Sequence, residues 1–131
     1  KGIREAVFNR FIMSYINDLE TICKINSYTK NKDGVDKVAS VMQEWLEAIG
    51  FKLTTYLRDN IGNHQLFTSS KIDGEKVLLL GHNDTVFPEG TFDNYHDDKY
   101  WVYGPGVCDM KGGNIVALES LRNLYFKNGE I

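Results

Sequence analysis

The chain has 131 residues, of which 42% are hydrophobic and 12% are aromatic, and its formal net charge is −3. This composition suits one folded domain, or one contiguous part of a larger domain, and excludes a disordered tail. The charge gives no sign of the clustered Lys and Arg that nucleic acids and anionic membranes require, so we expect neither partner. No apolar stretch approaches the roughly 20 residues of a membrane span.

The N-terminal stretch "KGIREAVFNRF" has neither a starting Met nor the layout of a signal peptide. We therefore expect that the observed start is a cut. A cytoplasmic location is expected, with a secreted or periplasmic location left open because a leader could have been removed. The two cysteines, Cys23 and Cys108, are too few for a disulfide framework, so free and buried thiols are expected.

Two amphipathic helices are predicted in the first part of the chain. Apolar residues recur at three- and four-residue steps across residues 5–23, and again across residues 35–49. The polar stretch "INSYTKNKDG" between them contains turn-forming residues and is predicted to be a loop. Gly50 stands where a helix commonly ends.

Three strands are predicted to follow, at residues 51–58, 64–69 and 76–82, with "RDNIGN" and "KIDGE" as turns. The stretch "VLLLG" lacks polar alternation, which predicts a strand covered on both faces, as in an α/β sheet. "YHDDKYWVYG" predicts a further turn and strand, and Gly112 and Gly113 open a last helix. The predicted buried face of that helix comprises Ile115, Val116, Leu118, Leu121, Leu124 and Tyr125.

The predicted strand at 76–82 runs into "GHNDT", which contains His82 and Asp84. Side chains two residues apart on an extended segment point the same way, and ligands of open α/β sheets gather beyond the carboxyl ends of the strands. An imidazole can bind zinc while a nearby carboxylate fixes its tautomer. Alone, the pair is equally compatible with a hydrogen-bonded polar pair of no catalytic role.

A second motif, "YGPGVCDMKGG", places Asp109 in a glycine-rich turn before the last helix. Its carboxylate is a hard ligand that can bridge two metal ions. A phosphate cradle is the competing interpretation. It fails because a P-loop needs Gly-Lys followed by Ser or Thr, whereas Lys111 precedes the glycines, and because a dinucleotide fingerprint would need Gly where Asp109 stands.

Together, "LLLGHNDTVFPEGTF" and "YGPGVCDMKGG" resemble the zinc-dependent exopeptidase and deacylase family, which includes bacterial glutamate carboxypeptidase, aminoacylase, acetylornithine deacetylase and succinyl-diaminopimelate desuccinylase. "TVFPEGT" leans toward the glutamate carboxypeptidase branch. The resemblance implies an α/β fold in which residues 1–131 form the N-terminal portion of a three-layer catalytic domain. It implies that His82 binds one of two zinc ions, that Asp84 orients His82 and is catalytic, and that Asp109 bridges both ions.

The implied activity is hydrolysis of a peptide or N-acyl amide bond by a metal-activated water, with zinc, or with cobalt or manganese in its place. The expected substrate is a small peptide or an N-acyl amino acid. In the family, an adjacent Glu-Glu pair, a further acidic ligand and a late histidine complete the site, and none of them is found here. We therefore expect the isolated chain to be inactive, to bind zinc weakly, and to self-associate or form a homodimer through exposed apolar faces.

Two other interpretations remain open at this point: a non-catalytic binding or assembly module on the same scaffold, and a single-metal hydrolase that uses His82 and Asp109 with water ligands. His96, beside Asp97 and Asp98, looks like a metal site, but its position between strand signals favours a solvated hairpin turn. Cys108 is expected to pack rather than to bind metal.

Overall fold

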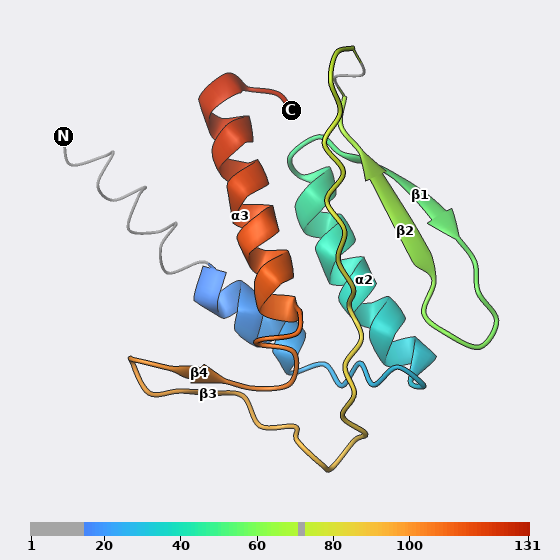
Figure 1. Ribbon diagram of the computed structural model, residues 1–131, viewed down its shortest axis with the longest axis vertical. Coiled ribbons are helices and arrows are strands. Elements are labelled where there is room, and N and C mark those ends of the chain that lie inside the picture. Colours follow the sequence, from blue (N-terminus) through green and yellow to red (C-terminus); the bar gives the residue numbers. More distant parts are fainter. Residues whose placement is uncertain (1–14, 71–72) are drawn as a thin grey trace.

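The computed structural model describes residues 15–70 and 73–131, so residues 5–14 of the first predicted helix lie outside the described residues. Residues 15–23 are helical, and Figure 1 shows this segment next to the start of the last helix. No helix in the described ranges is long and apolar enough to cross a membrane. The remaining elements are α2 (Lys32–Glu47), β1 (Lys52–Tyr56), β2 (His64–Thr68), β3 (His96–Asp97), β4 (Val102–Tyr103) and α3 (Lys111–Asn128).

The helix α2 begins three residues earlier than the apolar pattern predicts, because Asn31 caps it. The Asn31 side chain accepts a hydrogen bond from the backbone N–H of Gly34 at 3.2 Å and donates to the carbonyl of Asn26 at 3.0 Å. Such a side chain satisfies one of the free N–H groups of the first turn. The helix ends at Glu47, and Gly50, with a φ of 90°, then takes the left-handed conformation that turns the chain into β1.

The strands β1 and β2 form an antiparallel hairpin, with Lys52 opposite Thr68 at one end and Tyr56 opposite His64 at the other. The first two predicted strands are therefore confirmed. Figure 1 shows this hairpin beside α2. The strands β3 and β4, of two residues each, form a second antiparallel hairpin, as expected for the turn and strand predicted around residues 95–104.

The prediction of a buried strand at residues 76–82 is wrong for the described structure. The segment is extended, but no β ladder within residues 15–70 and 73–131 includes it, and its apolar side chains are exposed, from 57% at Leu79 to 87% at Val77. A strand needs a hydrogen-bonded neighbour. The two hairpins pair only internally, and the first paired residue after the segment is Thr85, which forms an isolated parallel bridge with Tyr28.

The helix α3 is found where it was predicted, but its buried face is narrower than expected. Ile115 and Leu118 are buried, whereas Val116 is 68% and Leu124 is 48% exposed. Leu121 and Tyr125 are only partly buried against the core. Successive residues of a helix point in directions about 100° apart, because one turn has 3.6 residues. When other helices pack against only one side of α3, the side chains on its other sides are exposed.

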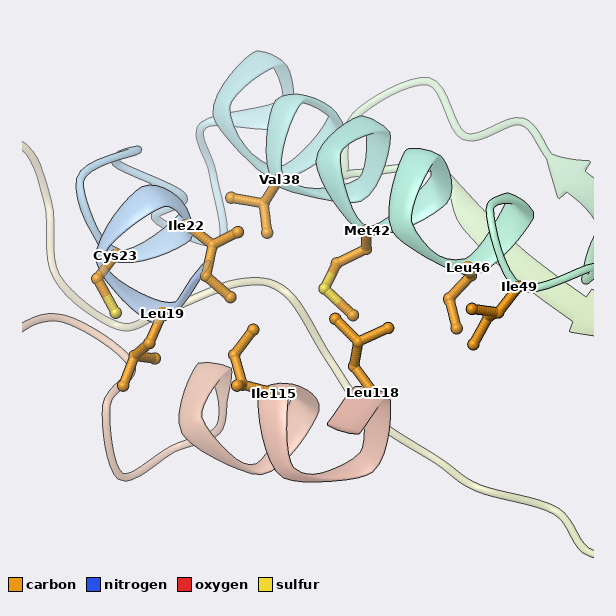
Figure 2. Close-up of a cluster of buried hydrophobic side chains, with 9 residues drawn as sticks. All are labelled: Leu19, Ile22, Cys23, Val38, Met42, Leu46, Ile49, Ile115 and Leu118. Carbon is orange, nitrogen blue, oxygen red and sulfur yellow. The ribbon is translucent and has the colours of Figure 1, made fainter. Parts of the chain in front are cut away.

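The hydrophobic core lies between the three helical segments rather than between helices and a sheet (Figure 2). The strands add partly buried side chains at its margin, such as Phe67 and Val102. The described residues thus combine helices with small antiparallel sheets, which is compatible with an α/β protein. The core residues are Leu19, Ile22, Cys23, Val38, Met42, Leu46, Ile49, Ile115 and Leu118.

Candidate metal centre

Three side chains from two loops meet beside the start of α3. The Nε2 atom of His82 lies 2.9 Å from a carboxylate oxygen of Asp109, although 27 positions separate the two residues. The Nδ1 atom of His82 lies 3.1 Å from the carboxylate oxygen Oδ1 of Asp84. The structure therefore brings together all three residues singled out in the sequence. Their roles in binding or catalysis stay predictions.

The loop that carries His82 and Asp84 is held by the segment following the first helix. The backbone N–H of Thr85 donates to the carbonyl of Ser27 at 2.8 Å, and the N–H of Thr29 donates to the carbonyl of Thr85 at 2.9 Å. The fully buried Ser27 hydroxyl donates to the carbonyl of Asn83 at 2.7 Å. These bonds fix the backbone on both sides of Asp84.

Asn114 of α3 holds the same loop from the other side. Its buried amide donates to the carbonyl of His82 at 2.7 Å and to the side-chain oxygen of Asn83 at 3.2 Å. The Asn83 side chain is thus directed at α3, while its two neighbours face each other, as expected for an extended segment. The close approach requires Gly81, because a Cβ there would lie 2.3 Å from the Asn114 side-chain oxygen.

The loop that carries Asp109 is anchored through Lys111 to the end of the first helix and the residues that follow it. This side chain is fully buried, and its ammonium donates to the carbonyls of Ile22 and Ile25 at 2.8 and 3.0 Å. Gly106, with a φ of 85°, passes directly over it, and a Cβ at that position would lie 2.8 Å from the Lys111 side chain. Burial lowers the pKa of Lys111, against the opposing charge effect of Cys23.

The electrostatics of the site centre on the imidazole of His82. Partial burial lowers the pKa of His82, but the hydrogen bonds and negative charges of Asp109 and Asp84 outweigh this effect, so the pKa is raised. Both ring nitrogens face a carboxylate, and an imidazole donates from both only when it is protonated. The Asp109 side chain is 85% exposed, so the site opens to solvent on its side.

This donor set fits part of the coordination shell of a divalent metal such as zinc. An imidazole nitrogen and a carboxylate oxygen are both zinc ligands, and here they approach within hydrogen-bond distance of each other. Asp84 faces the other ring nitrogen of His82, a placement from which a carboxylate can orient a metal-binding histidine. Residues 15–70 and 73–131 contain no group of three or more His, Cys, Asp or Glu residues arranged to hold a metal ion.

The other candidates from the sequence lie outside this site. His96 is exposed in β3, with its ring stacked on Tyr103 at a centroid distance of 6.1 Å. The carboxylates of Asp97 and Asp98 accept hydrogen bonds from backbone N–H groups of the following turn, as expected for a hairpin. Cys108 is exposed, which contradicts the expectation that it packs, because the loop before Asp109 faces outward.

Four residues that support the site were not singled out in the sequence: Ser27, Thr29, Lys111 and Asn114. Ser27 and Thr29 lie in the stretch "INSYT", whose composition indicates only a loop. Asn114 could have been noted, because it is a polar residue directly before the apolar positions of the predicted helix. Ser27, Thr29 and Asn114 bond to residues 82–85, more than 30 positions away, and Lys111 bonds to Ile22 and Ile25, more than 80 positions away, which no local pattern encodes.

No protein-family model matches the chain. Among curated proteins, it is 30% identical over 115 residues to carboxypeptidase G2 from Pseudomonas sp. (strain RS-16), an alignment that covers 83% of this chain and 27% of that protein. It is 31% identical over 125 residues to acetylornithine deacetylase from Aliivibrio fischeri (strain MJ11), covering 87% of this chain and 32% of the relative. The acetylornithine deacetylase from Photorhabdus laumondii is 31% identical over 97 residues, covering 68% and 25%.

The chain spans about a quarter to a third of the length of the curated relatives it matches. Their names are those of hydrolytic enzymes, a carboxypeptidase and a deacetylase, so the chain is a sequence relative of a family of hydrolases. The resemblance of the chain to the exopeptidases and deacylases is confirmed by these alignments, which extend over most of the chain.

Proposed function

We propose that the chain is the N-terminal portion of a three-layer catalytic domain that hydrolyses peptide or N-acyl amide bonds with a metal-activated water in a two-zinc site. The approach of His82 Nε2 to Asp109 at 2.9 Å is the observation that carries this proposal. The motifs "GHNDT" and "YGPGVCDMKGG" thereby each contribute a side chain to the same candidate site. The similarity to carboxypeptidase G2 and to acetylornithine deacetylase supports the reaction class.

Each of the three residues has a distinct proposed role. His82 would be a ligand to one metal, and the Asp109 carboxylate would be a ligand shared by both. Asp84 accepts the Nδ1–H of His82, which keeps the lone pair of Nε2 available. Metals held there would supply a water of lowered pKa and polarisation of the scissile carbonyl.

The site in this chain is incomplete under this proposal. A catalytic zinc has about three protein ligands, whereas residues 15–70 and 73–131 offer one imidazole and one shared carboxylate at this point. The remaining ligands and the general base are proposed to come from other segments of the parent protein. The 131-residue chain alone is therefore expected to bind zinc weakly and to be inactive.

The proposed substrates are small peptides or N-acyl amino acids, with N-acyl-glutamate as the first to test because of the resemblance to glutamate carboxypeptidase. We propose a cytoplasmic location for the parent protein. Self-association of this chain, or a homodimer, is proposed from the exposed apolar side chains at Val77, Leu78, Leu79 and Leu80. Cobalt or manganese is expected to substitute for zinc in assays.

The test compares turnover of N-acyl-glutamate and of a short peptide by the full-length protein and by the 131-residue chain, each with added zinc. In the full-length protein, His82→Ala and Asp109→Asn are expected to lower kcat/KM by more than about 100-fold, the upper end of the loss caused by removing an outer-shell partner. His64→Ala is the matched control, since His64 is an exposed histidine of β2. Full activity of Asp109→Asn would overturn the proposed site. Robust turnover by the isolated chain would overturn the proposal that its site is incomplete.

A further inference from the structure

We infer that Thr29 is a positioning residue that holds the Asp84 carboxylate against His82, an inference that rests on the proposed metal centre. The Thr29 hydroxyl donates to Oδ2 of Asp84 at 2.6 Å, while Oδ1 of the same carboxylate faces Nδ1 of His82 at 3.1 Å. The Nε2 atom of His82 then faces Asp109 at 2.9 Å. A continuous chain of four side chains thus ends at the proposed metal-binding atoms.

The backbone places Thr29 independently of its hydroxyl. Its N–H donates to the carbonyl of Thr85 at 2.9 Å, and the neighbouring residue Tyr28 forms a parallel bridge with Thr85. The hydroxyl also lies 3.2 Å from the carbonyl oxygen of Thr85. A hydroxyl has one proton to donate, and the shorter bond to the charged carboxylate is the stronger of the two. Thr29 is therefore held at the site by its backbone and is free to donate to Asp84.

The bond to Thr29 restricts the rotation of the Asp84 carboxylate. With Oδ2 held by the hydroxyl, Oδ1 stays directed at Nδ1 of His82, which favours the tautomer with a proton on Nδ1 and a lone pair on Nε2. The Asp84 side chain is 31% exposed, so water partly replaces the hydroxyl when it is removed. We therefore expect a partial loss of metal affinity rather than its abolition.

Thr29 differs in this respect from Ser27 and Asn114, which also hold the loop. Ser27 and Asn114 are buried and bond to backbone carbonyls, so their removal leaves buried groups unsatisfied and lowers the stability of the fold. Thr29 is exposed and acts on a side chain. Its hydroxyl can be removed by a Thr→Val substitution that keeps the branched shape.

The experiment measures the zinc affinity of the full-length protein by competition with a chromophoric chelator, together with kcat and KM for N-acyl-glutamate. Thr29→Val is expected to weaken zinc binding by about 10- to 100-fold, the usual effect of losing an outer-shell partner. Thr29→Ser keeps the hydroxyl and is expected to restore most of the affinity. Thr21→Val is the matched control, because Thr21 is an exposed threonine whose hydroxyl donates to the backbone carbonyl of Asn17.

Zinc binding by Thr29→Val equal to that of the unmodified protein would overturn the inference, as would a Thr29→Ser variant as impaired as Thr29→Val. His82→Ala in the same series separates this outcome from a failure of the proposed function. If His82→Ala loses zinc while Thr29→Val does not, the inference about Thr29 alone is wrong. If His82→Ala keeps the zinc affinity and stoichiometry of the unmodified protein, the proposed metal centre is wrong, and the role of Thr29 with it.

Discussion

At the residue scale, burial gives the two cysteines opposite chemistry. Cys23 is 1% exposed in the helical core, and burial raises its pKa from 9.0 to about 11, with the charge of Lys111 acting in the other direction. Cys108 is exposed in the loop before Asp109. The buried thiol therefore stays protonated over the whole physiological range, and only Cys108 is accessible to reagents.

The raised pKa of Cys23 predicts a loss of stability at high pH. Below pH 9 the thiol is protonated in both the folded and the unfolded chain, so its contribution is constant. Between pH 9 and about 11 the unfolded chain loses this proton and the folded chain keeps it, so the free energy of unfolding falls, by at most about 3 kcal/mol. Urea titrations at pH 8 and pH 11 measure this fall.

The control for this prediction is Cys23→Ala, which removes the thiol and is expected to show a smaller fall over the same pH interval. Cys108→Ala is expected to behave like the unmodified chain. An equal fall in all three proteins would contradict the assignment to Cys23, because other groups would then account for it.

The second prediction at this scale concerns Thr85, whose buried hydroxyl oxygen has no hydrogen-bond partner among the described residues. Burying an unpaired polar group costs about 1–3 kcal/mol. Thr85→Val removes the hydroxyl, keeps the side-chain shape, and leaves the backbone bonds to Ser27 and Thr29 in place. We expect its melting temperature to equal or exceed that of the unmodified protein.

Thr85→Ala provides the comparison, since it also removes a methyl group and is expected to melt at a lower temperature. A loss of more than about 1 kcal/mol in Thr85→Val would show that the hydroxyl has a stabilising partner after all.

At the scale of elements, side-chain contacts fix how the helices meet. The Arg122 guanidinium of α3 donates to Asp18 of the first helix and to Glu119, both at 2.6 Å, and lies 5.6 Å from the ring centroid of Trp45 in α2. These side chains are largely shielded from solvent, which strengthens their attraction. One residue thereby joins all three helical segments around the core that supports the site.

The prediction for an element concerns the start of α2, which Asn31 caps. Asn31→Ala removes the bond to the Gly34 N–H and is expected to lower the free energy of unfolding by about 1 kcal/mol. Asn31→Ser keeps a side-chain oxygen and is expected to recover part of this loss. Urea denaturation followed by circular dichroism measures both variants. Equal stability of Asn31→Ala and the unmodified protein would contradict the capping role.

At the scale of the whole molecule, the extended segment at residues 77–80 leaves an apolar surface exposed. Leu80 is 81% and Val77 is 87% exposed, although they belong to the most apolar run of the chain. An unpaired extended segment offers free N–H and C=O groups as well as apolar side chains. This combination is the physical basis for the proposed self-association.

We predict that sedimentation velocity of the 131-residue chain shows association that grows with protein concentration. Leu80→Lys is expected to weaken it without lowering the melting temperature, because the Leu80 side chain has little contact to lose. Asn123→Lys adds the same charge at an exposed position of α3 and is expected to leave the association unchanged. A monomer at all concentrations would contradict the proposal.

The sequence by itself determined the elements whose cause is local. The amphipathic pattern and Gly50 predicted α2, the turn residues predicted the turns of the β1–β2 and β3–β4 hairpins, and "GHNDT" and "YGPGVCDMKGG" singled out His82, Asp84 and Asp109. These features depend on neighbours within a few positions, so they can be read from a short window. The convergence of His82 with Asp109 followed from the family resemblance of the two motifs.

The tertiary structure alone decided the features that depend on distant partners. Residues 76–82 have the composition of a buried strand, yet they are exposed, because no strand within the described ranges pairs with them. Val116 is 68% exposed because no element among the described residues covers that side of α3. The bond between Thr29 and Asp84 joins residues 55 positions apart. Strand pairing and such contacts are set by the three-dimensional arrangement of segments, which local preference does not encode.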